Sequence, residues 1–369
     1  MSQYRIGIIG LGLIGGSLGM ALCRQPGNLR VVGYDSEPAT GQEALARQGV
    51  HEIAVSLECV VRGADLVVVA VPVGKIEQVV AEIASALAPG AIITDVASTK
   101  GRFAKVIPPL LPPGVHYVGG HPMAGSEQSG IAAADPFLFQ NAVYLLTPGS
   151  ETPPQVLAAL EQFIGMVGGL PLQLAPEEHD LMVAVVSHLP HLSAAALVNV
   201  AAEFNQRYPG TLALAAGGFH DTTRVAMGSP VLWREIFASN RASLLRVLKA
   251  MHGELAAFIA ALSVGEMAEV EARLERATVI RRELPARKKG FLTLLYELVV
   301  VIEDRPGTIA EVIDILKEIN IKDIEILRVR EGEGGTLRLA FEDENALKNA
   351  DQLLRARGFM TQVRGGEKR

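Results

Sequence analysis

A glycine-rich turn near the N-terminus has the residue types and spacing to bind a pyrophosphate. Residues 10–15 read Gly-Leu-Gly-Leu-Ile-Gly, after the apolar segment 4–10 and before a helix-like segment that runs to about residue 24. In this context the first glycine permits a tight turn, the second lets the backbone approach the phosphates, and the third lets the helix pack on the strand. The free N–H groups at the helix start then favour an anion. Five residues are therefore expected to bind a dinucleotide: Gly10, Gly12, Leu13, Ile14 and Gly15.

Asp35 ends a second apolar segment, twenty residues after Gly15, and bears on which dinucleotide binds. A carboxylate here accepts hydrogen bonds from the adenosine ribose hydroxyls and repels a 2′-phosphate, which predicts NAD rather than NADP. A carboxylate that only caps a helix is the alternative. The same cleft is expected to be lined by Ser36 and, at the end of the next strand, by Val71 and Pro72.

Ser98 and His121 follow two further apolar segments, where ligands bind in an open α/β sheet. With an unperturbed pKa of about 6.5, a histidine there can accept a proton from a substrate hydroxyl while a hydride leaves for nicotinamide. A loop histidine with only structural hydrogen bonds is the alternative. Lys100 is a rival acid or base, but a lysine beside a glycine turn is more often a solvated loop charge. Ser98 is also expected to contact the cofactor.

Arg224, in the segment 217–226, has the planar guanidinium that suits bidentate capture of a carboxylate. A surface arginine is the alternative. His188 and His191 share a helix face, and with His179 upstream they invite a metal interpretation. No third ligand lies at a usual spacing, so no metal site is predicted.

Three kinds of pattern, in order along the chain, must position these residues. Apolar strands alternating with helical stretches predict an α/β Rossmann domain over residues 1–171. Ala/Leu-rich helical patterns predict an all-α substrate and dimerisation domain over 172–284. A basic linker, 285–293, precedes a strand and helix order of β-α-β-β-α-β over 294–369, which predicts a ferredoxin-like domain.

The helical segment is apolar enough to need a partner for its faces. Between Asp180 and Glu203 there is no charged residue, a gap of about the length of a membrane span. His188, Pro190 and Asn199 would be costly in lipid, so a helix buried in a protein interface is the better interpretation. A second subunit supplies that interface most simply, and a homodimer is expected.

Composition excludes several classes of protein. The chain has 369 residues, 49% hydrophobic and 20% charged, which is typical of a globular protein with two or three domains. A net charge of −6 does not indicate nucleic-acid binding. Two cysteines form no disulfide framework, and no signal-peptide pattern precedes the first strand, so a cytoplasmic location without membrane attachment is expected.

Taken together, five segments resemble the prephenate dehydrogenase family. They are DVASTKG at 95–101, HPMAGSE at 121–127, SHLPH at 187–191, FHDTTR at 219–224 and SPVLWREI around Trp233, and the similarity spans nearly all of 1–285. The resemblance implies oxidative decarboxylation of prephenate to 4-hydroxyphenylpyruvate, CO2 and NADH.

The resemblance also implies roles for individual residues. His121 would accept a hydrogen bond from the C4 hydroxyl of prephenate, and Ser98 would orient that hydroxyl and His121. Arg224 and His191 would hold the side-chain carboxylate. Glu127 and Asp180 would lie near the pocket mouth, able to pair with Arg224 when the pocket is empty. Other residues expected to contact substrate are Ser126, Asp221 and Trp233.

Residues 294–365 resemble an ACT domain, a module that binds amino acids at paired interfaces. The motif that carries the resemblance is Glu-Asp-Arg-Pro-Gly-Thr at 303–308, followed by Ile-Asn-Ile at 319–321. Gly307 would open the helix N-terminus, with Thr308, to a carboxylate. Asp304 would take an α-ammonium group and Asn320 a polar edge. Tyrosine is the expected effector; a structural appendage without a ligand is the alternative.

Two rival functions stay open from the sequence. An arogenate dehydrogenase, or a cyclohexadienyl dehydrogenase of dual specificity, is the nearest, because the two substrates differ by one amine against one ketone. A rival of another class is a sensor without catalytic activity that uses NAD as a signal. The presence of Ser98, His121 and Arg224 together argues against that sensor.

Overall fold

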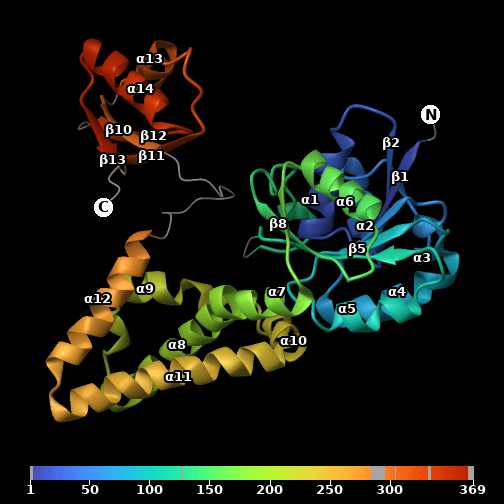
Figure 1. Ribbon diagram of the computed structural model, residues 1–369, viewed down its shortest axis with the longest axis horizontal. Coiled ribbons are helices and arrows are strands. Elements are labelled where there is room, and N and C mark those ends of the chain that lie inside the picture. Colours follow the sequence, from blue (N-terminus) through green and yellow to red (C-terminus); the bar gives the residue numbers. More distant parts are fainter. Residues whose placement is uncertain (1–2, 126–127, 284–295, 304, 331–333, 365–369) are drawn as a thin grey trace. The chain divides into compact units, whose positions relative to one another are not determined.

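The computed structural model describes residues 3–125, 128–283, 296–303, 305–330 and 334–364. It divides the chain into two units, Met1–Leu284 and Pro285–Arg369 (Figure 1). Ser126, Glu127, Asp304 and the whole of the predicted linker, 285–293, lie outside the described residues.

The first unit begins with a six-stranded parallel sheet in the order β3-β2-β1-β4-β5-β6. This is the strand order of a dinucleotide-binding Rossmann fold, so the predicted fold class is confirmed. Its strands are β1 Tyr4–Ile9, β2 Leu29–Tyr34, β3 Glu52–Ile53, β4 Leu66–Val69, β5 Ile92–Asp95 and β6 His116–Tyr117. The helices between them are α1 Leu13–Cys23, α2 Pro38–Ala46, α3 Leu57–Val61, α4 Ile76–Ile83 and α5 Phe103–Val106, with short 3-10 turns at Val73–Lys75, Ala84–Ala86 and Pro108–Leu110.

Helices cover both faces of this sheet, which is why its strands are continuous apolar runs. On one face, Ile6 and Val68 pack with residues of α1 and of α6 (Pro154–Met166). On the other, Val67 and Val69 pack with α3, α4 and α5. Figure 1 shows the two helix layers on either side of the strands.

A second, three-stranded sheet follows, in the order β7-β8-β9. It consists of β7 Gly119–Pro122, β8 Val143–Thr147 and β9 Leu170–Gln173, with a 3-10 turn at Ile131–Ala133 between the first two strands. His121 therefore lies inside β7 rather than beyond the end of a parallel strand, which corrects the expectation. Gly119 and Gly120 allow this path, because Cβ atoms there would lie 2.7 Å from Lys100 Cδ and 2.6 Å from the Asp95 carbonyl oxygen.

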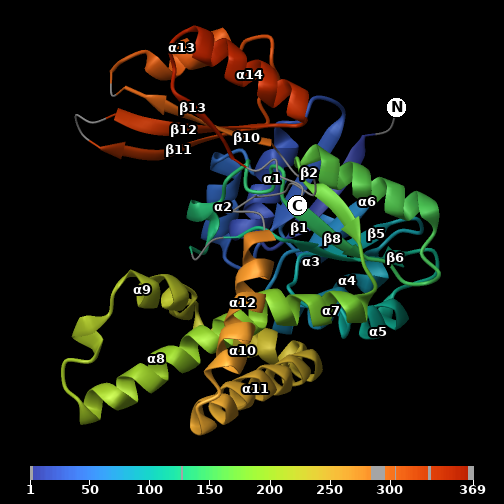
Figure 2. The same ribbon diagram turned by 60° about the vertical axis from the view of Figure 1, so that its left-hand side comes forward.

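The rest of the first unit is helical. The run α7 Pro176–Val183, a π-helical turn Ala184–His188 and α8 Leu189–Arg207 is followed by α9 Gly217–Thr223, α10 Pro230–Ser239, α11 Arg241–Val264 and α12 Met267–Glu283. Two 3-10 turns, Leu212–Leu214 and Arg224–Met227, flank α9. Figures 1 and 2 show α8 and α11 side by side, and α11 also contacts α7 and α12.

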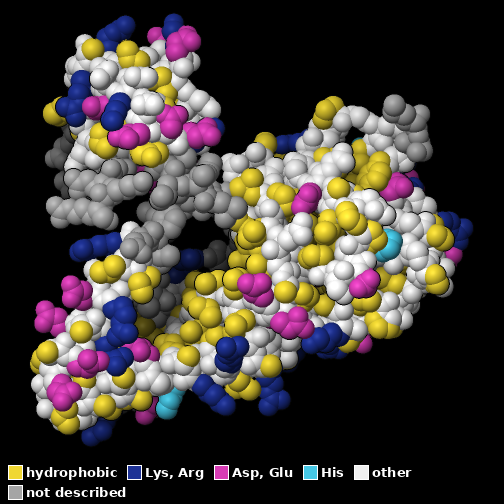
Figure 3. Space-filling model, in the orientation of Figure 1, with side chains coloured by type: hydrophobic (Ala, Val, Ile, Leu, Met, Phe, Trp, Pro, Cys, Tyr) yellow, Lys and Arg dark blue, Asp and Glu magenta, His cyan; other side chains and the backbone are white. Residues whose placement is uncertain are grey.

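These helices leave large apolar side chains on their surface. Val200 of α8 is 51% exposed and Ile259 of α11 is 65% exposed. Figure 3 shows hydrophobic side chains gathered over α7 and α8. By length and composition alone, Pro176–Arg207 and Arg241–Val264 could each cross a membrane. The first of these runs, however, buries His179 and Asp180 in hydrogen bonds within the first unit, which fits a protein interface better.

The second unit has the element order β-α-β-β-α-β that the sequence predicts. The four antiparallel strands lie in the order β11-β12-β10-β13. Its elements are β10 Tyr296–Ile302, α13 Thr308–Ile315, β11 Asp323–Arg330, β12 Gly334–Phe341, α14 Glu344–Ala356 and β13 Thr361–Arg364. Leu298, Val312, Phe341 and Leu354 lie in one buried core. Helix α13 ends at Ile315, and the next residue, Leu316, has left helical geometry.

Candidate active site

The glycine turn has the geometry of a pyrophosphate site. Gly10 has φ +91°, and a Cβ on Gly15 would lie 1.9 Å from the Gly10 carbonyl oxygen, so both positions require glycine. A Cβ on Gly12 would meet nothing within 4 Å, which leaves open space beside the backbone. Helix α1 starts there without a side-chain cap and without an acidic residue in its first turn. Its N–H groups are thus oriented for an anion, and the residues fit NAD.

Asp35 stands where the sequence predicts it, just after β2. Its Oδ2 accepts a hydrogen bond from the Leu11 N–H at 2.8 Å, and its Oδ1 accepts one from the Glu37 N–H at 2.9 Å. These bonds fix the carboxylate next to the glycine turn. A carboxylate oxygen has a second lone pair, so each can also accept a ribose hydroxyl.

Below the end of β5 lies a buried charged pair that the sequence did not indicate. The Lys100 ammonium is fully buried and pairs with the Asp95 carboxylate, which also accepts a hydrogen bond from the Tyr117 hydroxyl at 2.6 Å. Burial lowers the pKa of Lys100 against the opposing effect of the Asp95 carboxylate. The expectation of a solvated loop lysine was wrong, because the side chain turns inward to pair with Asp95 and lies beside Gly119 of the second sheet.

His121 is linked to α7 by a chain of hydrogen bonds. Its Nδ1 lies 2.9 Å from Nε2 of His179, and Nδ1 of His179 lies 2.9 Å from Oδ1 of Asp180. His121 is half-buried, whereas His179 and Asp180 are buried. Burial lowers the pKa of His121 well below its usual value, and positive charge on His179, Lys100 or His188 would lower it further. The imidazole is therefore neutral and able to accept a proton near pH 7.

Asp180 joins the two halves of the first unit. It accepts hydrogen bonds from the N–H groups of Lys100 at 2.7 Å and Gly101 at 2.8 Å, in the loop that carries Ser98. Its own carbonyl oxygen accepts a hydrogen bond from the Asn240 side chain at 2.6 Å. Asp180 was expected at the pocket mouth, pairing with Arg224. It lies instead as a buried structural carboxylate, because the N–H groups of the loop and His179 take up its oxygens.

An aromatic group from the helical part lies next to this cluster. The ring of His191 stacks on Trp233 with centroids 3.7 Å apart, and His188 meets Trp233 edge-on at 6.1 Å. Gly228 is required beside them, since a Cβ there would lie 2.6 Å from Trp233 Nε1. His188 is buried, and burial lowers its pKa to about 4. Burial also lowers the pKa of His191, so both imidazoles are neutral near pH 7.

The remaining predicted site residues lie at differing depths. Ser98 is half-buried, in the loop that Asp180 holds, and the neighbouring Thr99 hydroxyl is 2.8 Å from the Ser239 hydroxyl of α10. Arg224 and Asp221 are exposed, at the end of α9. No group of three His, Cys, Asp or Glu residues that could hold a metal occurs in the part of the chain that the structure describes.

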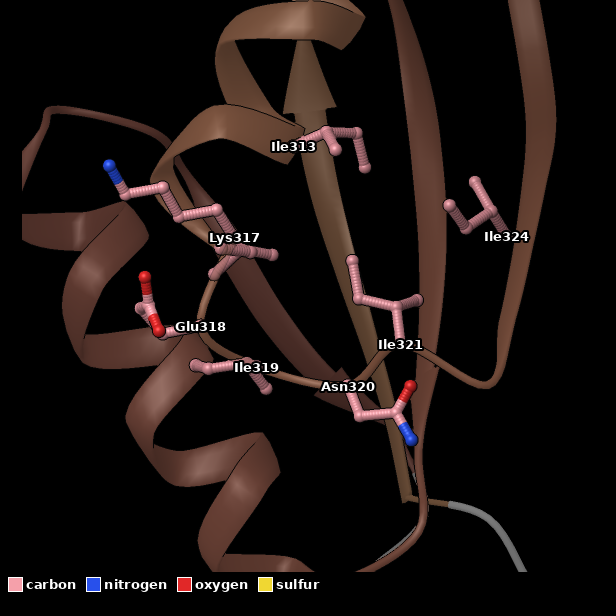
Figure 4. A pocket seen from close by; sticks show the side chains of 8 residues that line it. Ile313, Lys317, Glu318, Ile319, Asn320, Ile321 and Ile324 are labelled. Carbon is pink, nitrogen blue, oxygen red and sulfur yellow. The ribbon is translucent and has the colours of Figure 1, made fainter.

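In the second unit the predicted effector residues fall in two places. Gly307, with φ +92°, precedes α13, and the Thr308 hydroxyl donates to the Arg305 carbonyl oxygen at 3.1 Å. Asn320 lies at a pocket of about 560 Å³ lined also by Ile313, Leu316, Lys317, Glu318, Ile319, Ile321 and Ile324 (Figure 4). The described lining of that pocket does not include Gly307 or Thr308.

Comparison with known proteins decides the family. A family model described as the prephenate dehydrogenase nucleotide-binding domain matches residues 18–170, and one described as its dimerization domain matches 175–276. The prephenate dehydrogenase of Bacillus subtilis (strain 168) is 36% identical over 362 residues, which cover 97% of this chain and 98% of the relative. The chain belongs to the prephenate dehydrogenase family.

Other relatives of this family member carry names that indicate other substrates. A cyclohexadienyl dehydrogenase of Zymomonas mobilis is 36% identical over 245 residues, covering 66% of this chain and 83% of the relative. A solved arogenate dehydrogenase of Synechocystis superposes with a TM-score of 0.67 at 32% identity, covering 76% of this chain and 99% of that one.

A third solved structure bears on the cofactor. The prephenate dehydrogenase of A. aeolicus, in complex with hydroxyphenyl propionate and NAD+, superposes with a TM-score of 0.72 at 28% identity. The match covers 77% of this chain and 99% of that one. With the glycine turn described above, it establishes this family member as an NAD-dependent dehydrogenase.

Sequence reasoning missed several residues of this dehydrogenase's buried cluster. His179 was considered only as a metal ligand, and Asp95, Tyr117 and Asn240 were not singled out. Asp95 carried a usable signal, since it is a charged last residue of a strand that is otherwise buried. His179 carried none, because its contact with His121 depends on how α7 packs on the second sheet.

Proposed function

We propose that this chain oxidises prephenate with NAD to 4-hydroxyphenylpyruvate, CO2 and NADH. The observation that carries the proposal is His121: a half-buried imidazole, held neutral by its surroundings, beside the loop of Ser98. Bound NAD supplies the acceptor for the hydride that leaves C4 of the substrate. His121 accepts the proton of the C4 hydroxyl, and Ser98 orients that hydroxyl. Loss of CO2 then forms an aromatic ring and leaves a phenolate oxygen, which takes the proton back from His121. Because aromatisation drives this step, the protein needs mainly to position the substrate.

The helical part provides the candidates for holding the substrate carboxylate. Arg224 offers a guanidinium at the end of α9, and His191, which stacks on Trp233, forms a hydrogen bond with the backbone of the next residue, Val225. We assign carboxylate binding to Arg224 and His191 and a pocket wall to Trp233. Ser126, Glu127 and Asp221 complete the proposed substrate contacts.

The experiment that tests the reaction is product analysis with purified chain, prephenate and NAD. NADH, CO2 and 4-hydroxyphenylpyruvate are expected in equal amounts. Formation of NADH without CO2, or no NADH at all, would contradict the proposal. Arogenate is the second candidate substrate, favoured by the Synechocystis and Zymomonas mobilis relatives.

We further propose that the enzyme is a cytoplasmic homodimer joined through its helical part. The exposed apolar side chains of α8 and α11 support this, since monomeric proteins seldom expose large contiguous apolar patches. The description of the family model that matches residues 175–276 names dimerization. Sedimentation of the purified chain is expected to give twice the chain mass, and a monomer at micromolar concentration would contradict this.

We propose that the second unit is an ACT domain that senses tyrosine. The β-α-β-β-α-β order and the left-handed Gly307 before α13 support this assignment. A chain ending near Pro285 should oxidise prephenate but lose inhibition by tyrosine. Gly307→Val should have the same effect, because valine is strained at positive φ. Undiminished inhibition of the shortened chain would instead mean that tyrosine competes at the Arg224 pocket.

A further inference from the structure

The hydrogen-bond chain from His121 to Asp180 determines where the protons lie. Oδ1 of Asp180 accepts from the Lys100 N–H at 2.7 Å, so the carboxylate acts as an acceptor there. Nδ1 of His179, 2.9 Å from the same oxygen, must then carry a proton and donate it. A neutral imidazole has one N–H, so Nε2 of His179 is left as an acceptor.

The same reasoning extends one step to His121. Its Nδ1 lies 2.9 Å from Nε2 of His179, and two acceptors cannot share a hydrogen bond. Nδ1 of His121 therefore carries the proton, and Nε2 has the free lone pair. A doubly protonated His179 would instead donate from Nε2 to Nδ1 of His121, and the experiment below distinguishes the two arrangements.

We infer that His179 is a positioning residue that fixes His121 in the tautomer with a proton on Nδ1 and a basic Nε2. This inference rests on the proposed role of His121 as proton acceptor. The arrangement parallels the way a buried carboxylate sets the histidine tautomer in serine-protease triads, with a second imidazole inserted between the two groups. Because His179 and Asp180 belong to α7, the helical part orients the base of the nucleotide-binding part.

Two substitutions separate the hydrogen bond from simple packing. His179→Phe keeps an aromatic ring in the buried site but removes the acceptor from His121. His179→Gln keeps an acceptor oxygen near the position of Nε2. The matched control is His188→Gln, which changes another buried histidine of the same helical run, one whose hydrogen-bond partner is Asn240.

The test combines ¹⁵N NMR of histidine side chains with steady-state kinetics of the full chain at pH 7. We expect His121 of the unsubstituted protein to be protonated on Nδ1 only. His179→Phe should shift that proton to Nε2 and lower kcat by roughly 10²-fold, with KM for NAD and prephenate nearly unchanged. His179→Gln and His188→Gln should keep the tautomer and at least a tenth of kcat.

Three results would overturn the inference: His121 protonated on Nε2 in the unsubstituted protein, His179 protonated on both nitrogens, or His179→Phe retaining kcat within threefold. If His179→Phe does not fold, the spectrum of the unsubstituted protein and the activity of His179→Gln decide. The spectrum needs no turnover. A chain that shows the expected tautomer but does not oxidise prephenate would contradict the proposed function and leave this inference standing.

Discussion

Two regions of the first unit differ in which side chains they bury and which they expose to solvent. Where α7 meets the loop after β5, charged and polar groups are buried, and each is bonded to another: Lys100 to Asp95, His179 to Asp180 and His121. Along α8 and α11, apolar side chains such as Val200 and Ile259 stand in solvent. The first region pairs its polar groups within one chain, whereas the second leaves an apolar face for the proposed partner subunit. The proposed chemistry and the proposed assembly can therefore be tested separately.

Substitutions in the polar region should cost more folding free energy than substitutions in the apolar region. A buried ion pair or hydrogen-bond chain leaves an uncompensated group when one member is removed. Replacing an exposed apolar side chain removes only its contribution to packing against the proposed partner subunit. Substitutions in the two regions should accordingly change different quantities, with catalysis affected in one and association in the other.

His121→Asn should have the largest effect. The variant loses the proton acceptor, and general-base catalysis contributes about 10²–10⁴-fold, so kcat should fall by that factor with KM for NAD nearly unchanged. Steady-state kinetics with prephenate measures both. A variant that keeps more than a tenth of the original kcat would remove His121 from this role.

The pH dependence of the unsubstituted enzyme sharpens the same point. Because burial disfavours the imidazolium form of His121, its pKa lies well below the ordinary histidine value. Protonation of His121 should therefore reduce activity only below about pH 6.5, the ordinary pKa of a histidine. An acid limb of kcat/KM at or above pH 6.5 would show that another group, or an unperturbed histidine, accepts the proton.

Arg224→Ala should act on binding. An arginine that holds the carboxylate in both ground and transition states contributes mainly to KM. Arg224 is exposed in the single chain, so we expect the lower end of the usual range, about 2 kcal/mol or roughly a 30-fold rise in KM for prephenate. Arg234→Ala and Arg241→Ala are the comparison variants. An unchanged KM for Arg224→Ala would place the carboxylate at one of those two.

Val200→Asp tests the apolar region. A charge buried in an interface is costly, so this variant should dissociate at concentrations where the unsubstituted chain is dimeric. Sedimentation velocity measures the change. Val55→Asp is the matched control, because Val55 is 90% exposed on the nucleotide-binding part. Equal behaviour of the two variants would mean that the face of α8 is not an interface.

His188→Gln should produce the smallest effect, a weaker pH dependence of the free energy of unfolding. The pKa of His188 is about 4 in the folded chain, whereas an unfolded histidine titrates near 6.5. Below pH 6.5 the unfolded state binds more protons, so stability falls as pH drops towards 4. This contributes a loss of at most about 2 kcal/mol between pH 7 and 5. Urea unfolding of His188→Gln should show a correspondingly weaker pH dependence; an identical slope would contradict it.

The sequence was informative where the determining contacts are local. The glycine turn, Asp35 and the buried strands were predictable because each depends on neighbours in the chain. The order of elements after residue 294 was predictable for the same reason. The burial of Lys100 was not predictable, since its side chain lies beside Gly119 of the second sheet and its loop is held by Asp180 of α7, 80 residues later. The contact of His121 with His179 joins residues 58 positions apart and depends on how two parts of the chain pack.

The central claim is that the chain oxidises prephenate with NAD, with His121 of the buried polar region as the proton acceptor. It is tested most directly by kcat/KM for prephenate and for arogenate, each measured with NAD on the full chain. The account predicts NADH formation with prephenate. It also predicts a clearly higher kcat/KM for prephenate than for arogenate. Turnover of arogenate with little or none of prephenate would contradict the proposed substrate while leaving the NAD-dependent chemistry in place. Failure with both substrates would contradict the account itself.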